Sequence, residues 1–169
     1  SIMAEFIQKH KLFSFYSTLM IIVVLIAIFA PWLAPGDAFS SNLSQALQAP
    51  SSQHWFGTDK LGRDVLSRII YGTQLSLFMG VSIVVIMVSI GTIIGAVAGY
   101  FGGKIEMVLM RLADIMLSFP GVVLAIAIAG ILGGSIVNTI IALSVVGWAK
   151  YARLVRSMTL KVRGEEYVT

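Results

Sequence analysis

The chain contains an uncharged run of 24 residues, Leu75-Ser-Leu-Phe-Met-Gly-Val-Ser-Ile-Val-Val-Ile-Met-Val-Ser-Ile-Gly-Thr-Ile-Ile-Gly-Ala-Val-Ala98. At about 1.5 Å per residue, an α-helix of this length crosses the roughly 30 Å hydrocarbon core of a bilayer. The nearest charges are Arg68 and Lys104. Tyr71 and Tyr100 lie near the two ends of the run, where interfacial aromatic side chains are expected. The run therefore predicts a transmembrane helix.

The composition of the whole chain agrees with a membrane protein. The 169 residues are 57% hydrophobic and 12% charged, against about 45–50% and about 25% in soluble domains. A β-barrel would alternate apolar and polar residues, which these runs do not. The chain has no cysteine, which excludes disulfides, a thiolate nucleophile and a cysteine-based metal site. We expect an all-α fold, a polytopic transmembrane helical bundle.

Three more apolar stretches predict further spans, at 12–33, 105–132 and 136–156. The last two are separated by Gly133-Gly134-Ser135, which offers a tight reversal. A cleaved signal peptide is the alternative for the first stretch, but its apolar region would be about 7–15 residues long. Since the stretch is longer and ends in Pro-Trp-Leu-Ala-Pro35, an uncleaved anchor is favoured. Four spans result.

The distribution of lysine and arginine along the chain indicates how the chain is oriented in the membrane. The formal net charge is +4, which in a membrane protein reports topology rather than nucleic-acid binding. Because cytoplasmic loops carry the excess of positive charge, the amino terminus and residue 169 are both predicted to be cytoplasmic. We therefore divide the chain into three segments. They are a tail with the first anchor (1–33), an external segment (34–72), and a core of three spans that ends at the start of a cytoplasmic loop (73–169). The cations on the cytoplasmic side are Lys9, Lys11, Lys104, Arg111, Lys150, Arg153, Arg156, Lys161 and Arg163.

Two features within the spans predict helix packing and bending. Gly91, Gly95 and Gly99 recur every four residues and form a stripe that lets another backbone come close. This stripe is expected to pack within the chain, with a subunit interface as the alternative. Pro120 and Gly121 interrupt the third span, because proline removes a helical hydrogen bond. They are a candidate hinge or a helix boundary.

Arg111 and Asp114 are two charged residues inside the third predicted span. Their i, i+3 spacing allows an ion pair on one face of the helix, and a charge within a span is a candidate functional residue. An amphipathic stretch at the cytoplasmic surface is the alternative, because Asp114 lies only about 15 Å from Lys104 along a helix.

Catalytic residues are scarce. His10 and His54 are the only histidines and both lie outside the predicted spans, so an intramembrane Ser–His pair and a multi-histidine metal site are excluded. The chain has no phosphate-binding Gly-x-x-x-x-Gly-Lys-Ser/Thr motif. We expect no enzyme activity, no metal and no cofactor in this chain.

The external segment carries its polar residues in one dense string. Glycines permit turns there, and the charged side chains can make charge-assisted hydrogen bonds that fix a loop against the membrane. A structural loop is the plainer interpretation, and a functional site is the other. The candidate residues are Gly57, Thr58, Asp59, Gly62, Arg63 and Asp64.

Four motifs together resemble the C-type permease subunit of bacterial ABC importers for dipeptides, oligopeptides and nickel. They are Phe56-Gly-Thr-Asp-Lys-Leu-Gly-Arg-Asp-Val-Leu-Ser-Arg68, Met110-Arg-Leu-Ala-Asp114 with Phe119-Pro120, Trp148-Ala-Lys-Tyr-Ala-Arg-Leu-Val-Arg156, and Arg163-Gly-Glu-Glu-Tyr-Val168. The resemblance covers nearly the whole chain.

This resemblance implies the partners and the working parts of the protein. It implies a second permease subunit, two cytoplasmic ATPases that bind ATP and Mg, and a separate extracellular or periplasmic substrate-binding protein, all at the bacterial inner membrane. Glu165, Glu166, Tyr167 and Val168 would begin the loop that couples to the ATPase. The family has six helices, so we expect a piece of a longer permease. Di- or oligopeptides are the expected substrates; a nickel or metal-chelate importer and a small ATP-independent channel or secondary transporter are the alternatives.

Overall fold

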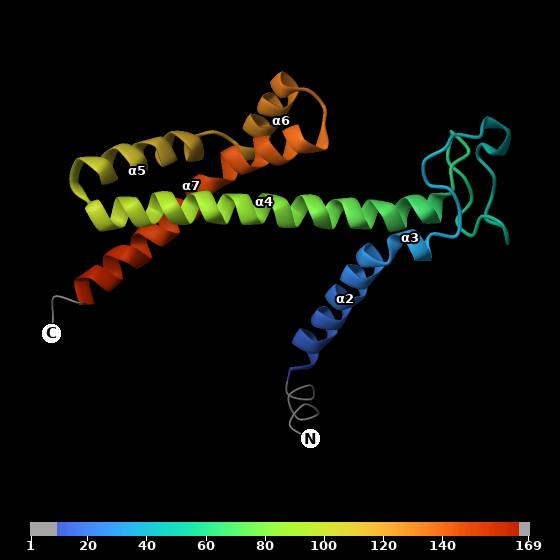
Figure 1. Cartoon of the computed structure of the whole chain (residues 1–169), viewed down its shortest axis with the longest axis horizontal. Coiled ribbons are helices and arrows are strands. Elements are labelled where there is room, and N and C mark those ends of the chain that lie inside the picture. The colour runs from blue at the N-terminus through green and yellow to red at the C-terminus, as the bar shows by residue number, and fades with distance from the viewer. Residues whose placement is uncertain (1–9, 166–169) are drawn as a thin grey trace. The chain divides into compact units, whose positions relative to one another are not determined.

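The computed structural model describes residues 10–165, and the regular elements among these residues are helices. The helices are α2 (Lys11–Ile28), α3 (Ala30–Leu33), α4 (Val65–Phe101), α5 (Gly103–Ser118), α6 (Gly121–Leu132) and α7 (Ile136–Glu165), with a short 3₁₀ turn at Leu43–Gln45. The chain forms two compact units that divide between Phe78 and Met79, within α4. Figure 1 shows the order of the elements.

The long helix α4 contains the predicted span 75–98 and extends it at both ends. It has 37 residues, or about 55 Å of helix against a hydrocarbon core of roughly 30 Å. Its first turn begins at Val65, so the last eight residues of the predicted external segment, 65–72, are helical. Asp64 provides the hydrogen bonds that start the helix there, as described below.

The number of spans differs from the prediction of four. Two described helices, α2 and α4, are long and apolar enough to cross a membrane, and a third span results if the bent pair of α5 and α6 counts as one. The fourth predicted span, 136–156, is the first part of α7. This helix continues to Glu165, and its lysines and arginines lower its apolar character.

The third predicted span, 105–132, is two helices rather than one. α5 and α6 meet at an angle of 92°. Phe119 has an extended backbone, with φ −88° and ψ 146°, because the ring of the following proline disfavours the helical conformation at the preceding residue. Pro120 then precedes the first turn of α6. The break expected at Pro120 is therefore present and sharper than a kink.

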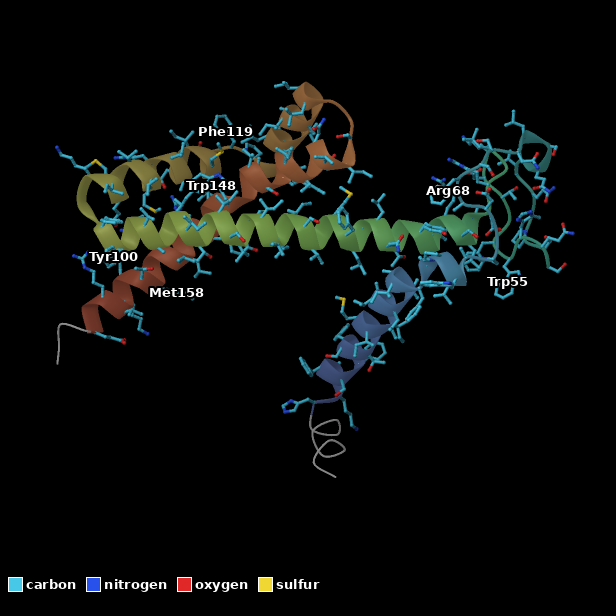
Figure 2. All side chains as sticks on the ribbon, viewed as in Figure 1. Trp55, Arg68, Tyr100, Phe119, Trp148 and Met158 are labelled. Carbon is cyan, nitrogen blue, oxygen red and sulfur yellow. The ribbon has the colours of Figure 1, made fainter. Side chains whose placement is uncertain are left out.

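In the unit from Met79 onward, α4, α5 and α7 share a core of small side chains. Ala113, Ala149 and Ala152 are fully buried around Trp148, and Ile94, Met110 and Met116 pack against them. Figure 1 shows α7 crossing α4, and Figure 2 places Trp148 near the crossing. Small residues let helix backbones approach closely where no water-driven force holds them together.

The glycine stripe of α4 lies against α7. A methyl group added at Gly95 would come within 2.4 Å of the carbonyl oxygen of Ala152, and one at Gly99 within 2.7 Å of Cβ of Thr159. A methyl group at Gly91 would come within 2.6 Å of Cβ of Tyr151. Since residue numbers rise together on both helices, α4 and α7 run in the same direction here. The glycines thus set the distance between the two helices.

In the unit that ends at Phe78, a hydrogen bond joins the first helix to the long one. The side-chain amide of Gln74 donates to the backbone carbonyl of Ala27 over 2.9 Å. Ala27 is buried in the last turn of α2. This bond places the last turn of α2 beside the third turn of α4.

Candidate functional site

Asp64 is the centre of the segment 34–72, which the sequence predicts to be external and which we call the external segment. One carboxylate oxygen accepts hydrogen bonds from the backbone N–H of Ser67 at 3.0 Å and from its hydroxyl at 2.6 Å. This is the N-cap arrangement that satisfies free N–H groups at a helix start. The other oxygen lies 2.9 Å from Nδ1 of His54. The Ser67 hydroxyl in turn accepts from the N–H of Gly36 at 2.9 Å, so one carboxylate organises three chain segments.

Burial and hydrogen bonds act in opposite directions on the ionisation of Asp64. The residue is 2% exposed and Ser67 is 0% exposed. Desolvation raises the pKa of Asp64, but the hydrogen bonds from Ser67 and His54 outweigh it and hold that pKa below its ordinary value. Asp64 is therefore a carboxylate at neutral pH, which suits its role as an acceptor.

Asp59 organises the turn that precedes α4. One of its oxygens accepts from the N–H groups of Leu61 and Arg63, each at 2.9 Å, and the other accepts from Nε of Arg63 at 2.8 Å. Arg68 reaches the same carboxylate with Nε at 3.7 Å. The backbone hydrogen bond from Arg63 is the largest of the effects that lower the pKa of Asp59. The carboxylate thus fixes its own loop, as an aspartate commonly does in turns.

Gly57 and Gly62 are required by the local backbone. Both have positive φ, 72° and 75°. A methyl group at Gly57 would come within 2.4 Å of the carbonyl oxygen of Gln48, and one at Gly62 within 1.7 Å of the carbonyl oxygen of Asn42. The motif and the polar stretch before it are therefore packed backbone to backbone.

Thr58 completes this packing. Its hydroxyl accepts from the N–H of Gln48 at 2.8 Å and donates to the carbonyl oxygen of Gln45. The six predicted residues of the external motif are thus brought together, and each holds the fold of the segment. Figure 2 labels Arg68 and Trp55 in this part of the chain.

Sequence reasoning missed two members of this cluster. Ser67 had a usable signal, because it lies three residues after Asp64, the spacing of a helix cap. His54 had none, since it lies ten residues before Asp64 and no helical or strand spacing connects the two. In the structure its side chain is 15% exposed and contacts the carboxylate.

A groove between α5 and α7 contains five charged side chains of the second unit. It has a volume of about 580 Å³ and is lined by Gly103, Glu106, Met107, Met110, Arg111, Asp114, Arg153 and Arg156. Arg156 donates from Nε to Glu106 at 2.6 Å, and Arg153 forms an ion pair with Asp114. Each pair joins α5 to α7.

The predicted pairing of Arg111 with Asp114 is wrong. The structure pairs Asp114 with Arg153, from 39 positions along the chain. Within the described part of the chain, no carboxylate lies at ion-pair distance from Arg111. Helical spacing reveals partners on the same helix only, whereas the long Arg153 side chain comes from a neighbouring helix that the core brings close.

The remaining predicted residues have clear positions. Pro120 and Gly121 stand at the start of α6. Glu165 is the last residue of α7, and Glu166, Tyr167 and Val168 lie outside the described residues. Among residues 10–165, no three His, Asp or Glu side chains gather as they would around a metal ion.

Comparison with known proteins matches two families. The family described as "Binding-protein-dependent transport system inner membrane component" matches residues 91–169. The family described as "N-terminal TM domain of oligopeptide transport permease C" matches residues 7–50.

Individual relatives cover nearly the whole chain. The dipeptide transport system permease protein DppC of Alkalihalophilus pseudofirmus is 44% identical over 96% of this chain and 53% of its own length. The oligopeptide transport system permease protein OppC of Bacillus subtilis is 37% identical over 95% and 53%. The nickel transport system permease protein NikC of Escherichia coli is 38% identical over 87% and 53%. The chain spans about half the length of the curated relatives it matches.

Proposed function

Because this chain belongs to the family of inner-membrane components of binding-protein-dependent transport systems, we propose that it is part of a permease subunit of an ATP-driven importer. Its helices would form the translocation pathway together with those of a second permease. The observation that carries this proposal is the agreement of fold and relatives: a helical membrane chain whose 44% identical relative is a dipeptide permease.

The proposed substrates are dipeptides and oligopeptides. The dipeptide permease of Alkalihalophilus pseudofirmus is 44% identical to this chain, against 38% for the nickel permease and 37% for the oligopeptide permease. Uptake measurements on cells that carry the complete importer distinguish a peptide importer from a nickel importer. Competition of labelled dipeptide uptake by unlabelled peptides supports the proposal, whereas uptake of nickel without competition by peptides would replace it with a metal importer.

Hydrolysis of ATP is proposed to occur in two partner subunits. The sequence has no phosphate-binding loop, so the energy must arrive through contact. The start of the coupling loop is proposed at Glu165, Glu166, Tyr167 and Val168, directly after α7. In the full-length permease, deletion of 164–169 should abolish substrate-stimulated ATP hydrolysis; retained stimulation would refute this assignment.

The proposed orientation places the amino terminus and residue 169 in the cytoplasm. It is supported by the Lys and Arg residues near both ends of the chain and by Lys104 at the start of α5. Since the chain has no cysteine, single cysteines at Ser52 and Ser157 can report it. A membrane-impermeant thiol reagent added to intact cells should label position 52 and spare position 157, and the reverse pattern would invert the topology.

The assembly itself can be tested by purification from native membranes in mild detergent. The proposal expects a second permease and ATPases with a phosphate-binding loop to accompany this protein. Recovery of the protein with copies of itself only would favour a small self-assembling channel instead.

A further inference from the structure

α5 is a rigid segment between two breaks in the helical backbone. At its amino end, Gly102 and Gly103 both have positive φ, 64° and 56°, a conformation that other residues rarely adopt. At its carboxyl end, Phe119 is extended and α6 departs at 92°. Backbone that leaves the helical conformation at both ends lets the intervening 16 residues change direction as one body.

Two ion pairs attach this segment to α7. Arg156 binds Glu106 in the first turn of α5, and Arg153 binds Asp114 in its last two turns. The two attachments are eight residues apart on α5, or about 12 Å, so together they prevent α5 from pivoting on α7.

The contact between α4 and α7 is of another kind. It is made by Gly91, Gly95 and Gly99 against the backbone and Cβ atoms of α7. A polar contact between these two helices lies at the end of α4, where Arg163 donates to the carbonyl oxygen of Tyr100 at 3.2 Å. Met87 of α4 also packs against Gly147 of α7. A contact that lacks ion pairs permits one helix to shift along another, a movement of about 1–2 Å in many switching proteins.

From this difference we propose that Glu106 and Asp114 are positioning residues that make α5 move with α7 when α7 shifts along α4. The inference rests on the proposed function, because the shift would originate at the ATPase end of α7. Displacement at Glu165 would then be passed through Arg153 and Arg156 to α5, and from there to the bend at Pro120. The α5 segment would thereby transmit motion into the pathway.

Charge exchange tests this role in the complete importer, with the ratio of substrate-stimulated to basal ATP hydrolysis as the readout. Glu106→Arg should lower the ratio at least about fivefold, the lower end of typical coupling effects. The double variant Glu106→Arg with Arg156→Glu should restore it. An unchanged ratio in the single variant, or no restoration in the double variant, would overturn the proposal. Arg111→Gln is the matched control, because it removes a groove cation without a described carboxylate partner, and it should leave the ratio unchanged.

If the importer with Glu106→Arg fails to assemble, a distance measurement tests whether α5 moves with α7. Spin labels can be placed at the exposed positions Val108 on α5, Leu154 on α7 and Ile93 on α4. Between nucleotide-free and nucleotide-trapped importer, the 108–154 distance should stay constant while the 93–154 distance changes. A 108–154 change as large as the 93–154 change would overturn the proposal.

These outcomes are separate from the proposed function. If the unmodified importer shows no ATP-dependent uptake, the proposed function fails, whatever the effect of the charge exchange. If uptake is normal and the charge exchange has no effect, only the positioning role of Glu106 and Asp114 fails.

Discussion

Asp64 and Ser67 form a closed pair at the amino end of α4, in which one carboxylate oxygen accepts both the backbone N–H and the hydroxyl of the serine at 3.0 and 2.6 Å. The pair is buried, and it explains why α4 begins at Val65 rather than at the start of the uncharged run. It also connects the long helix to Gly36 through the serine hydroxyl.

Replacement of Asp64 by alanine should destabilise the external segment by about 1–3 kcal/mol. The variant loses a helix cap and leaves the buried Ser67 groups without their acceptor. Thermal unfolding of the purified importer, with protease cleavage of the external segment as a local measure, would report the effect. Ser52→Ala, an exposed change in the same segment, is the control, and equal stability of the two variants would contradict the role of Asp64.

Replacement of Gly62 by alanine should be similarly damaging, for a different reason. The positive φ costs an L-residue about 1–2 kcal/mol, and the added methyl group would overlap the carbonyl oxygen of Asn42. Faster proteolysis of residues 42–62 is the expected result. Gly72→Ala provides the comparison, because nothing lies within 4 Å of a methyl group there. If Gly62→Ala were as resistant as Gly72→Ala, the described turn would be incorrect.

Replacement of Gly95 by alanine should separate α4 from α7 and destabilise the unit by about 1–3 kcal/mol, as overpacking commonly does. The methyl group would lie 2.4 Å from the backbone oxygen of Ala152, which cannot rotate away. Gly80→Ala, in open space on the same helix, should be neutral. The melting temperature of the purified importer compares them, and a Gly95→Ala variant as stable as Gly80→Ala would refute the packing.

Acidification should loosen the external segment. The folded pKa values of Asp59 and Asp64 are lowered, whereas an unfolded aspartate titrates at about 3.9. Their stabilisation is therefore complete above the unfolded pKa and is lost as the pH falls through the folded values. Hydrogen exchange of residues 57–67 should be constant from about pH 7 to pH 5, once corrected for intrinsic rates, and should accelerate below about pH 4. Loosening that begins near pH 6 would assign the effect to another group.

Much of the fold could be predicted from local patterns. Runs without charge located α2 and α4, because a bilayer imposes a minimum apolar length. The four-residue recurrence of Gly91, Gly95 and Gly99 identified a packing face, and Pro120 identified a break. These are properties of a single helix, which sequence spacing describes well.

Contacts between distant segments could not be predicted in the same way. Asp114 has an arginine three residues away, yet it binds one from α7. His54 reaches Asp64 only because the loop folds back, and no periodicity signals that. The sharp turn at Phe119 divided a stretch that had enough apolar length for one span. In each case the contact depends on how distant segments fold together, and local sequence spacing does not indicate it.

We propose that this chain is part of an importer driven by ATP hydrolysis in partner subunits. The most direct test reconstitutes the complete importer in liposomes, with ATP enclosed and a labelled dipeptide and its binding protein outside. The labelled dipeptide should accumulate in the lumen when ATP is enclosed. Accumulation should stop when ADP replaces the ATP. Equal uptake with enclosed ADP would contradict the account.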